Sequence, residues 1–161
     1  MARYIIRVAR QTGLIAMFVG TAIFGTVSGV LFAFVGDLET APQWVPDLVS
    51  MRKVTEGPIG VGTRYVEMVQ MGKQQEEAQL RVTQIEPPRL FAFEGEGGPS
   101  RFQVRYVLES DEGGTKLTHD YTMQMTGCFW IMTPFVHGWV KKNSRAGLDN
   151  LRKLLTSEAE S

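Results

Sequence analysis

Cysteine and histidine are scarce in this sequence, which has one cysteine and two histidines among 161 residues. A single cysteine, Cys128, excludes an internal disulfide and any zinc site built from several thiolates. The two histidines and the cysteine lie too far apart in sequence to predict a histidine-rich metal site. We therefore expect no metal and no cofactor. Cys128 is expected to be a small buried hydrophobic residue, with a reactive thiol as the alternative.

An excess of charge of either sign is also absent, because 17 lysines and arginines balance 17 aspartates and glutamates. Without a net charge the protein has no long-range field that would attract nucleic acid or an acidic partner. The sequence also lacks a glycine-rich phosphate loop, a nucleophile elbow and an HExxH motif. The balanced charge predicts no nucleic-acid partner. The length is that of one domain, and none of the common catalytic motifs is present in it.

Charged residues are missing altogether between Gln11 and Gly36. This run exceeds the roughly 20 apolar residues that cross a bilayer. Arginines precede it and acidic residues follow it, as an inward-facing amino terminus requires. One interpretation is therefore a membrane anchor over residues 13–35, which would tether a lipid carrier to a membrane. The interpretation we favour is a cytoplasmic protein in which this run is buried.

In the favoured interpretation the apolar run contains a strand, a turn and a helix. Residues 15–24 have β-compatible side chains, residues 25–29 form the turn, and residues 30–38 form the helix. Ser28 or Thr26 would cap this helix by accepting a hydrogen bond from one of its first amides. Short apolar runs do not distinguish a buried strand from a buried helix, so both interpretations of the run stay open.

After Trp44 the chain is divided by short glycine, proline and aspartate clusters into six strand-like segments. These segments are residues 48–56, 63–71, 76–85, 89–96, 101–110 and 115–125. Regular spacing with turn residues between the segments is typical of an antiparallel meander. Alternation assigns an inner face to the last two segments, where it is clearest. The inward residues are Phe102, Val104, Tyr106 and Leu108, followed by Leu117, His119, Tyr121, Met123 and Met125.

The last predicted element is a long helix with Thr133 as its N-cap and Pro134 in its first turn. Its apolar positions recur at helical spacing, at Val136, Trp139, Val140, Gly147, Leu148, Leu151, Leu154 and Leu155. Small or polar residues at Asn143, Ser144 and Gly147 interrupt this apolar stripe. Such a notch is expected where a helix covers a cavity, and close backbone packing at Gly147 is the alternative.

Four segments carry a resemblance to a known family. They are "LFAFVGDLETAPQWVP", "GPIGVGTRY", "VTQIEPPRLFAFEG" and "GGTKLTHDY". With the pattern of elements they resemble the START-like superfamily, and within it the polyketide cyclase/dehydrase and lipid-transport group called SRPBCC. The resemblance extends from Val30 to Leu155. It implies an α+β helix-grip fold, in which a curved antiparallel sheet of six to seven strands surrounds a long C-terminal helix.

The amino terminus departs from this family pattern. The family joins its first strand to its first helix by a short acidic, proline-containing turn, whereas residues 11–29 are longer, apolar and lack proline. Residues 3–10 also alternate like a strand and compete with residues 15–24 for the first place in the sheet. We expect residues 1–12 to be an N-terminal extension or extra strand, residues 13–157 to form the ligand-binding domain, and residues 158–161 to be a frayed tail.

Trp44 is placed between Pro42 and Pro46 in this family pattern. The short helices before it would close one side of the curved sheet. Trp44 is therefore predicted to be a wedge where these helices meet the sheet and the terminal helix, in contact with ligand as well, while the prolines fix the direction of the chain. Asp37 is expected to be a solvated or capping carboxylate at the end of the first helix.

The resemblance implies binding or transport of a small hydrophobic or lipid-like ligand in an internal cavity. The alternative without a ligand is a structural or regulatory domain whose interior is filled by side chains. The predicted lining is Trp44, Phe102, Val104, Tyr106, His119, Tyr121, Met123, Phe135, Trp139 and Ser144. The protein would be a monomer or a homodimer.

The alternative is a cyclase, dehydratase or isomerase acting on a hydrophobic, polyketide-like substrate. In that case His119 and Tyr121 would move protons next to a carbonyl group. Glu67 is a second candidate acid, although its strand has apolar residues on both faces and does not predict its direction. His137 is expected at the surface or at the cavity rim, and Arg64, Arg81 and Arg105 on outer faces.

Overall fold

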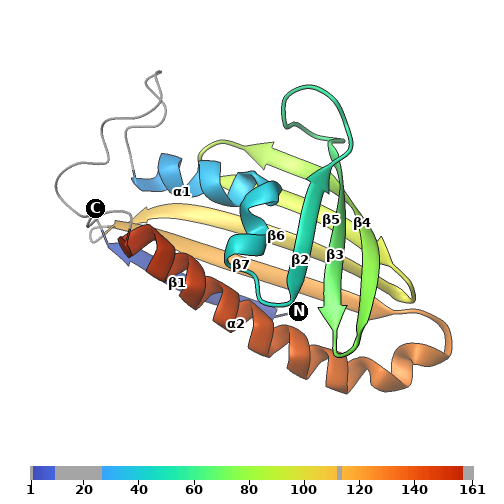
Figure 1. Cartoon of the computed structure of the whole chain (residues 1–161). Helices are drawn as coiled ribbons and strands as arrows, with labels where there is room; N and C mark the ends of the chain where they lie inside the picture. Colours follow the sequence, from blue (N-terminus) through green and yellow to red (C-terminus); the bar gives the residue numbers. More distant parts are fainter. Residues whose placement is uncertain (1, 10–26, 112–113, 158–161) are drawn as a thin grey trace.

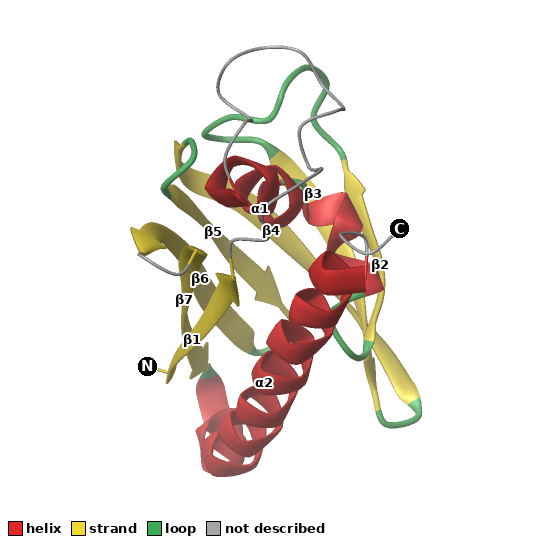
Figure 2. Cartoon of the chain, turned by 90° about the vertical axis from the view of Figure 1, so that its left-hand side faces the viewer, coloured by secondary structure: helices red, strands yellow, loops and turns green. Residues whose placement is uncertain are grey.

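The structure is a computed structural model that describes residues 2–9, 27–111 and 114–157. Its strands are β1 (Ala2–Ala9), β2 (Leu48–Lys53), β3 (Arg64–Met71), β4 (Gln74–Glu86), β5 (Leu90–Gly97), β6 (Ser100–Asp111) and β7 (Gly114–Met125). Its helices are α1 (Val27–Gly36), the 3-10 helices η1 (Leu38–Gln43) and η2 (Gly127–Met132), and α2 (Thr133–Ser157). The strands form one antiparallel sheet in the order β1-β7-β6-β5-β4-β3-β2. The sheet curves, and α2 crosses its open side (Figures 1 and 2). The predicted helix-grip fold is confirmed.

The six strands predicted after Trp44 all form, as β2 to β7. Each pairs with its neighbour in sequence, as expected of a meander. The tight turns between them contain glycines in the left-handed region, such as Gly72 with a φ of 64° and Gly98 with a φ of 52°. Other residues rarely adopt this conformation, so these glycines explain why the chain reverses at the predicted places.

The first strand of the sheet is the segment at the amino terminus. β1 pairs with β7 along its whole length, from Ala2 opposite Tyr121 to Ala9 opposite Gly114. The strand predicted over residues 15–24 lies outside the described residues, as does most of the membrane-anchor segment. Within the ranges that the structure describes, every helix is too short or too polar to cross a bilayer.

Helix α1 begins at Val27, so the prediction of a turn at residues 27–29 was wrong. Ser28 lies inside the helix instead of capping it. Its hydroxyl is 2.8 Å from Thr115 Oγ1 of β7, and both side chains are buried. The apolar side chains of α1 continue the same contact, because Leu31, Phe32 and Val35 are buried against the sheet. Tertiary packing on β7 therefore extends the helix by three residues beyond its predicted start.

Asp37 begins the 3-10 helix η1 that follows α1. Its carboxylate accepts a hydrogen bond from the backbone N–H of Glu39 at 3.1 Å. The capping role predicted for this residue is confirmed, and it satisfies an amide that the helix start leaves without a partner.

Trp44 ends η1 and is buried, with 4% of its surface exposed. Its ring meets the Tyr106 ring of β6 edge to face at 6.4 Å. On the other side, a Cβ built on Gly147 of α2 would lie 3.5 Å from the Trp44 carbonyl oxygen and 3.5 Å from Pro46 Cδ. The predicted wedge between helices and sheet is confirmed. The close packing of α2 at Gly147 therefore has a defined partner.

Candidate functional site

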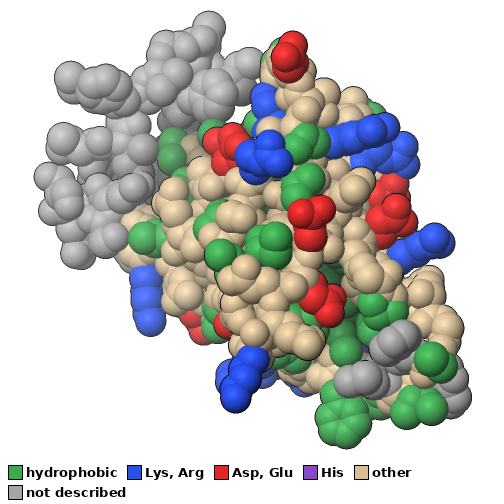
Figure 3. Space-filling model, turned by 45° about the vertical axis from the view of Figure 1, so that its right-hand side comes forward, with side chains coloured by type: hydrophobic (Ala, Val, Ile, Leu, Met, Phe, Trp, Pro, Cys, Tyr) green, Lys and Arg blue, Asp and Glu red, His purple; other side chains and the backbone are tan. Residues whose placement is uncertain are grey.

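A cavity of about 180 Å³ lies between the concave face of the sheet and α2. Hydrophobic side chains gather around a hollow on this face of the molecule, with acidic side chains beside it (Figure 3). Its walls come from η1 and the turn after it, from all strands between β2 and β7, and from the middle of α2. The space predicted between the sheet and the notched helix is therefore present, and Asn143 and Ser144 of the notch face it.

The predicted lining residues converge on this cavity with one exception. Those that line it are Trp44, Phe102, Val104, Tyr106, His119, Tyr121, Met123, Trp139 and Ser144. They come together because β6 and β7 pair in register, which places Phe102 opposite Met123 and Tyr106 opposite His119 on one face of the sheet.

Phe135 is the exception, because its side chain is 78% exposed and does not line the cavity. It lies one helical turn before Trp139, where the start of α2 extends past the strands (Figure 1). The helical spacing predicted the correct face of α2, but only tertiary structure shows where the sheet ends beneath it.

The prediction that Cys128 is buried was also wrong, since this thiol is exposed in η2. This short 3-10 helix connects β7 to α2, and the thiol of Cys128 faces solvent there. His137 is exposed as predicted, and so are the three arginines expected on outer faces, Arg64, Arg81 and Arg105. Among the described residues, no group of three His, Cys, Asp or Glu side chains is placed to hold a metal ion.

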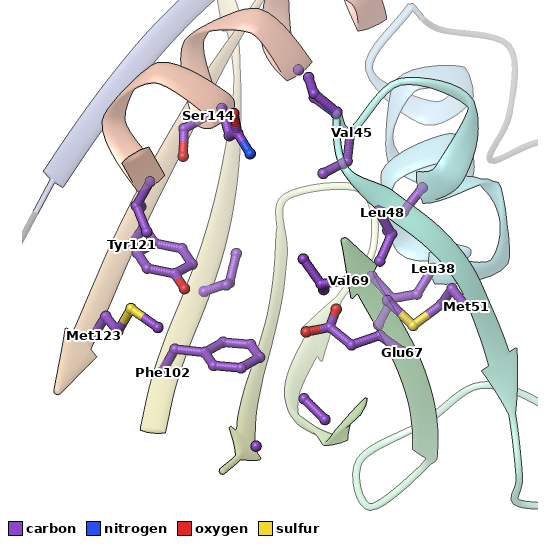
Figure 4. Close-up of a pocket in the computed structure, with 18 of the residues that line it drawn as sticks. Leu38, Val45, Leu48, Met51, Glu67, Val69, Phe102, Tyr121, Met123 and Ser144 are labelled. Carbon is purple, nitrogen blue, oxygen red and sulfur yellow. The ribbon is translucent and has the colours of Figure 1, made fainter. Parts of the chain in front are cut away.

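The sequence did not predict the wall formed by β2 and β3. Leu48, Met51, Glu67 and Val69 line this side of the cavity (Figure 4). β3 gave no usable alternation, because most of its side chains are half-buried on both faces. The inward face of β3 could have been found from the next strand, β4, where the apolar residues Ala78, Leu80 and Val82 alternate with polar ones. Glu67 pairs with Ala78, so the register gives Glu67 the inward face.

Glu67 presents the carboxyl group of this wall. Its side chain points across the cavity toward Phe102 (Figure 4). It makes no hydrogen bond or ion pair with any residue that the structure describes. Burial alone raises its pKa to about 7, because a charged carboxylate loses its hydration inside the protein. Near neutral pH this group therefore exists in both protonation states.

His119 lies on the opposite wall among aromatic rings. Its imidazole stacks on Tyr106 at a centroid distance of 4.9 Å and meets Tyr121 edge to face at 6.3 Å. Burial lowers its pKa to about 4, against a weaker opposing effect of Asp120. His119 is therefore neutral at pH 7, and burial together with the charge of Glu67 raises the pKa of both neighbouring phenols.

Phe102 and Tyr121 form a second aromatic pair in the cavity wall. Their rings are nearly parallel, with centroids 6.0 Å apart. Phe102 lies over Gly95 of β5, where an added Cβ would overlap the ring. The absence of a side chain at Gly95 therefore provides the space in which the Phe102 ring lies flat.

Asp47 and Asn143 connect α2 to the turn before β2. Asn143 Nδ2 donates to Asp47 Oδ2 at 2.8 Å, and the Asp47 carbonyl accepts from the Gln70 amide at 2.7 Å. Asp47 has a φ of 64°, a left-handed conformation that aspartate tolerates better than most residues. These bonds hold the turn, β3 and the helix together beside the cavity.

Comparisons with known proteins agree with this architecture. The sequence model of the family "Polyketide cyclase / dehydrase and lipid transport" matches residues 29–156. A solved structure from Thermus thermophilus has 15% identity and a TM-score of 0.70, and the match covers 98% of this chain and 96% of that one. The ZhuI aromatase/cyclase from Streptomyces sp. R1128 has 13% identity and a TM-score of 0.67, covering 94% and 90%. A conserved Geobacillus kaustophilus protein has 18% identity and a TM-score of 0.67, covering 96% and 93%. At these identities the likenesses establish the fold, and no curated protein sequence matches.

Proposed function

Because the chain belongs to the polyketide cyclase/dehydrase and lipid transport family, as its sequence resemblance predicted, we propose that it binds one small hydrophobic molecule in the internal cavity. The observation that carries this proposal is the cavity itself, about 180 Å³ with mostly apolar walls and a few polar groups. Burial of a ligand there contributes about 25 cal/mol per Å² of apolar surface before ordering costs. The phenols, the imidazole and Glu67 would orient one polar end.

Volume restricts the ligand. A cavity of 180 Å³ is slightly larger than the roughly 150 Å³ cavity that holds benzene in an engineered protein. It is smaller than the roughly 300–1,000 Å³ of sites for drug-sized molecules. We therefore propose a ligand with one or two rings or a short chain, rather than a long polyketide or a diacyl lipid.

Native mass spectrometry of the purified protein tests this function, because a bound small molecule adds its mass to that of the chain. Replacing Ser144 by phenylalanine would fill the cavity from α2 and should abolish the mass increment. Lys142→Phe is the matched control, since Lys142 is exposed on the same helix and does not line the cavity. Equal ligand retention by both variants would contradict binding in this cavity.

A cyclase, dehydratase or isomerase is the second candidate function. It is favoured by the position of His119 and Tyr121 in the cavity wall, and by the aromatase/cyclases among the structural neighbours. With its low pKa, His119 would be a weak base, whereas Glu67 is matched to proton transfer near neutral pH. His119→Gln should change the affinity for a bound substrate no more than a few-fold. It would abolish turnover only if the protein is an enzyme of this kind.

A further inference from the structure

We propose that the cavity is selective for a hydrophobic amine, whose ammonium group would pair with Glu67 while its rings occupy the apolar space. This inference rests on the proposed binding function and specifies the chemical class of the ligand. Its basis is the asymmetry of charge in the cavity wall. Among the described residues that line it there are carboxyl groups, but neither lysine nor arginine.

Glu67 is the least exposed carboxyl group among the described residues of the wall, because Glu76 and Glu77 are exposed to solvent. It projects from β3 into the cavity, and the described part of the chain supplies no hydrogen bond or ion pair to it. Glu67 is half-buried, so its carboxylate loses part of its hydration without gaining a partner, and an ammonium group from a ligand would offset that loss. A ligand carboxylate would meet the same group with repulsion, so acidic ligands such as fatty acids are disfavoured.

The surrounding rings favour a cation as well. Glu67 points toward Phe102 (Figure 4), and the Phe102 ring stacks on Tyr121. Tyr106 also lines the cavity. Aromatic faces attract ammonium groups within about 6 Å by roughly 0.5–2 kcal/mol. A carboxylate beside aromatic faces therefore offers an amine both an ion pair and a cation–π contact. An alcohol of the same shape would form only a hydrogen bond with the carboxylate.

None of the other titratable groups that line the described cavity supplies a positive charge that could pair with Glu67. They are Glu76 and Glu77 of β4, Tyr106 of β6, and His119 and Tyr121 of β7. The lining residues from η1, β2, β5 and α2 include no titratable side chain. His119 is neutral at pH 7 and the phenols are protonated, so the cavity interior carries negative charge or none. Amine binding should therefore shift Glu67 to its ionised form and release a proton.

Three probes with the same ring system test the inference by isothermal titration calorimetry. They are 1-naphthylmethylamine, 1-naphthalenemethanol and 1-naphthoate, which present an amine, an alcohol and a carboxylate. The expected result at pH 7 is that the amine binds at least ten-fold more tightly than the alcohol, with the carboxylate weakest. Glu67→Gln should erase the preference for the amine while the alcohol still binds. Glu56→Gln removes an exposed carboxylate away from the cavity and should keep the preference.

A second measurement on the unchanged protein decides the question without a variant. Titrations at pH 6–7 in buffers of different ionisation enthalpy should show proton release with the amine and none with the alcohol. If the alcohol binds as tightly as the amine, or no proton is released, the amine inference is overturned and the binding function stands. If none of the three probes binds at millimolar concentration, the binding function and the amine inference both fail.

Discussion

At the scale of single residues, Glu67 and His119 shift in opposite directions for the same reason. Burial disfavours the charged form of each, which raises the pKa of the acid to about 7 and lowers that of the base to about 4. Both groups are therefore mostly neutral in the folded protein over much of the mildly acidic range. This neutrality keeps the cavity wall compatible with an apolar ligand.

These shifts predict how stability depends on pH. The raised pKa of Glu67 contributes stability that is fully present below pH 4.5 and is lost as pH rises to about 7. The lowered pKa of His119 contributes stability that is present above pH 6.5 and is lost as pH falls to about 4. In the unchanged protein the two effects nearly cancel between pH 4.5 and 6.5.

Single variants should expose each effect separately. With Glu67→Gln, the free energy of unfolding should rise with pH from 4 to 6.5, by on the order of 1–3 kcal/mol. With His119→Gln it should fall from pH 4.5 to 7 by a similar amount. Urea unfolding across this range measures both slopes, and profiles parallel to that of the unchanged protein would contradict the assigned shifts.

Tyr65 provides a second prediction at this scale. Its side chain is 1% exposed, and its hydroxyl has no hydrogen-bond partner among the described residues. Burial raises its pKa to about 12, with a further contribution from Asp37 and Glu39. Tyr65→Phe removes a buried polar group that makes no bond. The free energy of unfolding should therefore stay equal or rise by about 1 kcal/mol, as measured by urea unfolding at pH 7, and a loss of 1 kcal/mol or more would reveal a partner for this hydroxyl.

At the scale of elements, the pairing of β5 with β6 sets the position of one cavity wall. Gly95 and Phe102 are register partners, and the aromatic ring occupies the place of the missing side chain. Tight cross-strand packing of this kind makes the two positions dependent on each other.

Gly95→Ala should therefore destabilise the protein by roughly 1–3 kcal/mol, because its Cβ overlaps the Phe102 ring. The loss should be smaller when Phe102 is also replaced by leucine, which a double-mutant cycle in urea measures. Gly60→Ala is the control, since nothing lies within 4 Å of its added Cβ. Additive effects of the Gly95 and Phe102 replacements would show that the ring does not depend on the glycine.

At the scale of the whole molecule, the curved sheet and α2 enclose a space that their side chains do not fill. The walls of this 180 Å³ cavity come together only in the folded protein, so a ligand that fits them binds the folded state and not the unfolded chain. A ligand that occupies it should therefore stabilise the entire domain. Occupation of the cavity by a ligand should therefore raise the free energy of unfolding.

The expected thermal effect follows from mass action. A ligand at a hundred times its dissociation constant adds about 2.7 kcal/mol to the free energy of unfolding. For a domain of this length that corresponds to a rise in Tm of about 5–10 °C. Differential scanning calorimetry with 1-naphthalenemethanol should show this rise in the unchanged protein and not in Ser144→Phe. A similar rise in the variant would place the probe elsewhere.

The resemblance to the family predicted the wedge at Trp44. The sequence by itself determined the strands from β2 to β7, the inner faces of β6 and β7, and the long helix. These features depend on local alternation, turn residues and helical spacing, which neighbouring residues express directly. Only the tertiary structure decided the inward direction of Glu67, the edge position of β1, the start of α1 at Val27, and the exposure of Phe135 and Cys128. Each of these depends on which segment lies opposite another and where the sheet ends, and such contacts join residues far apart in the chain.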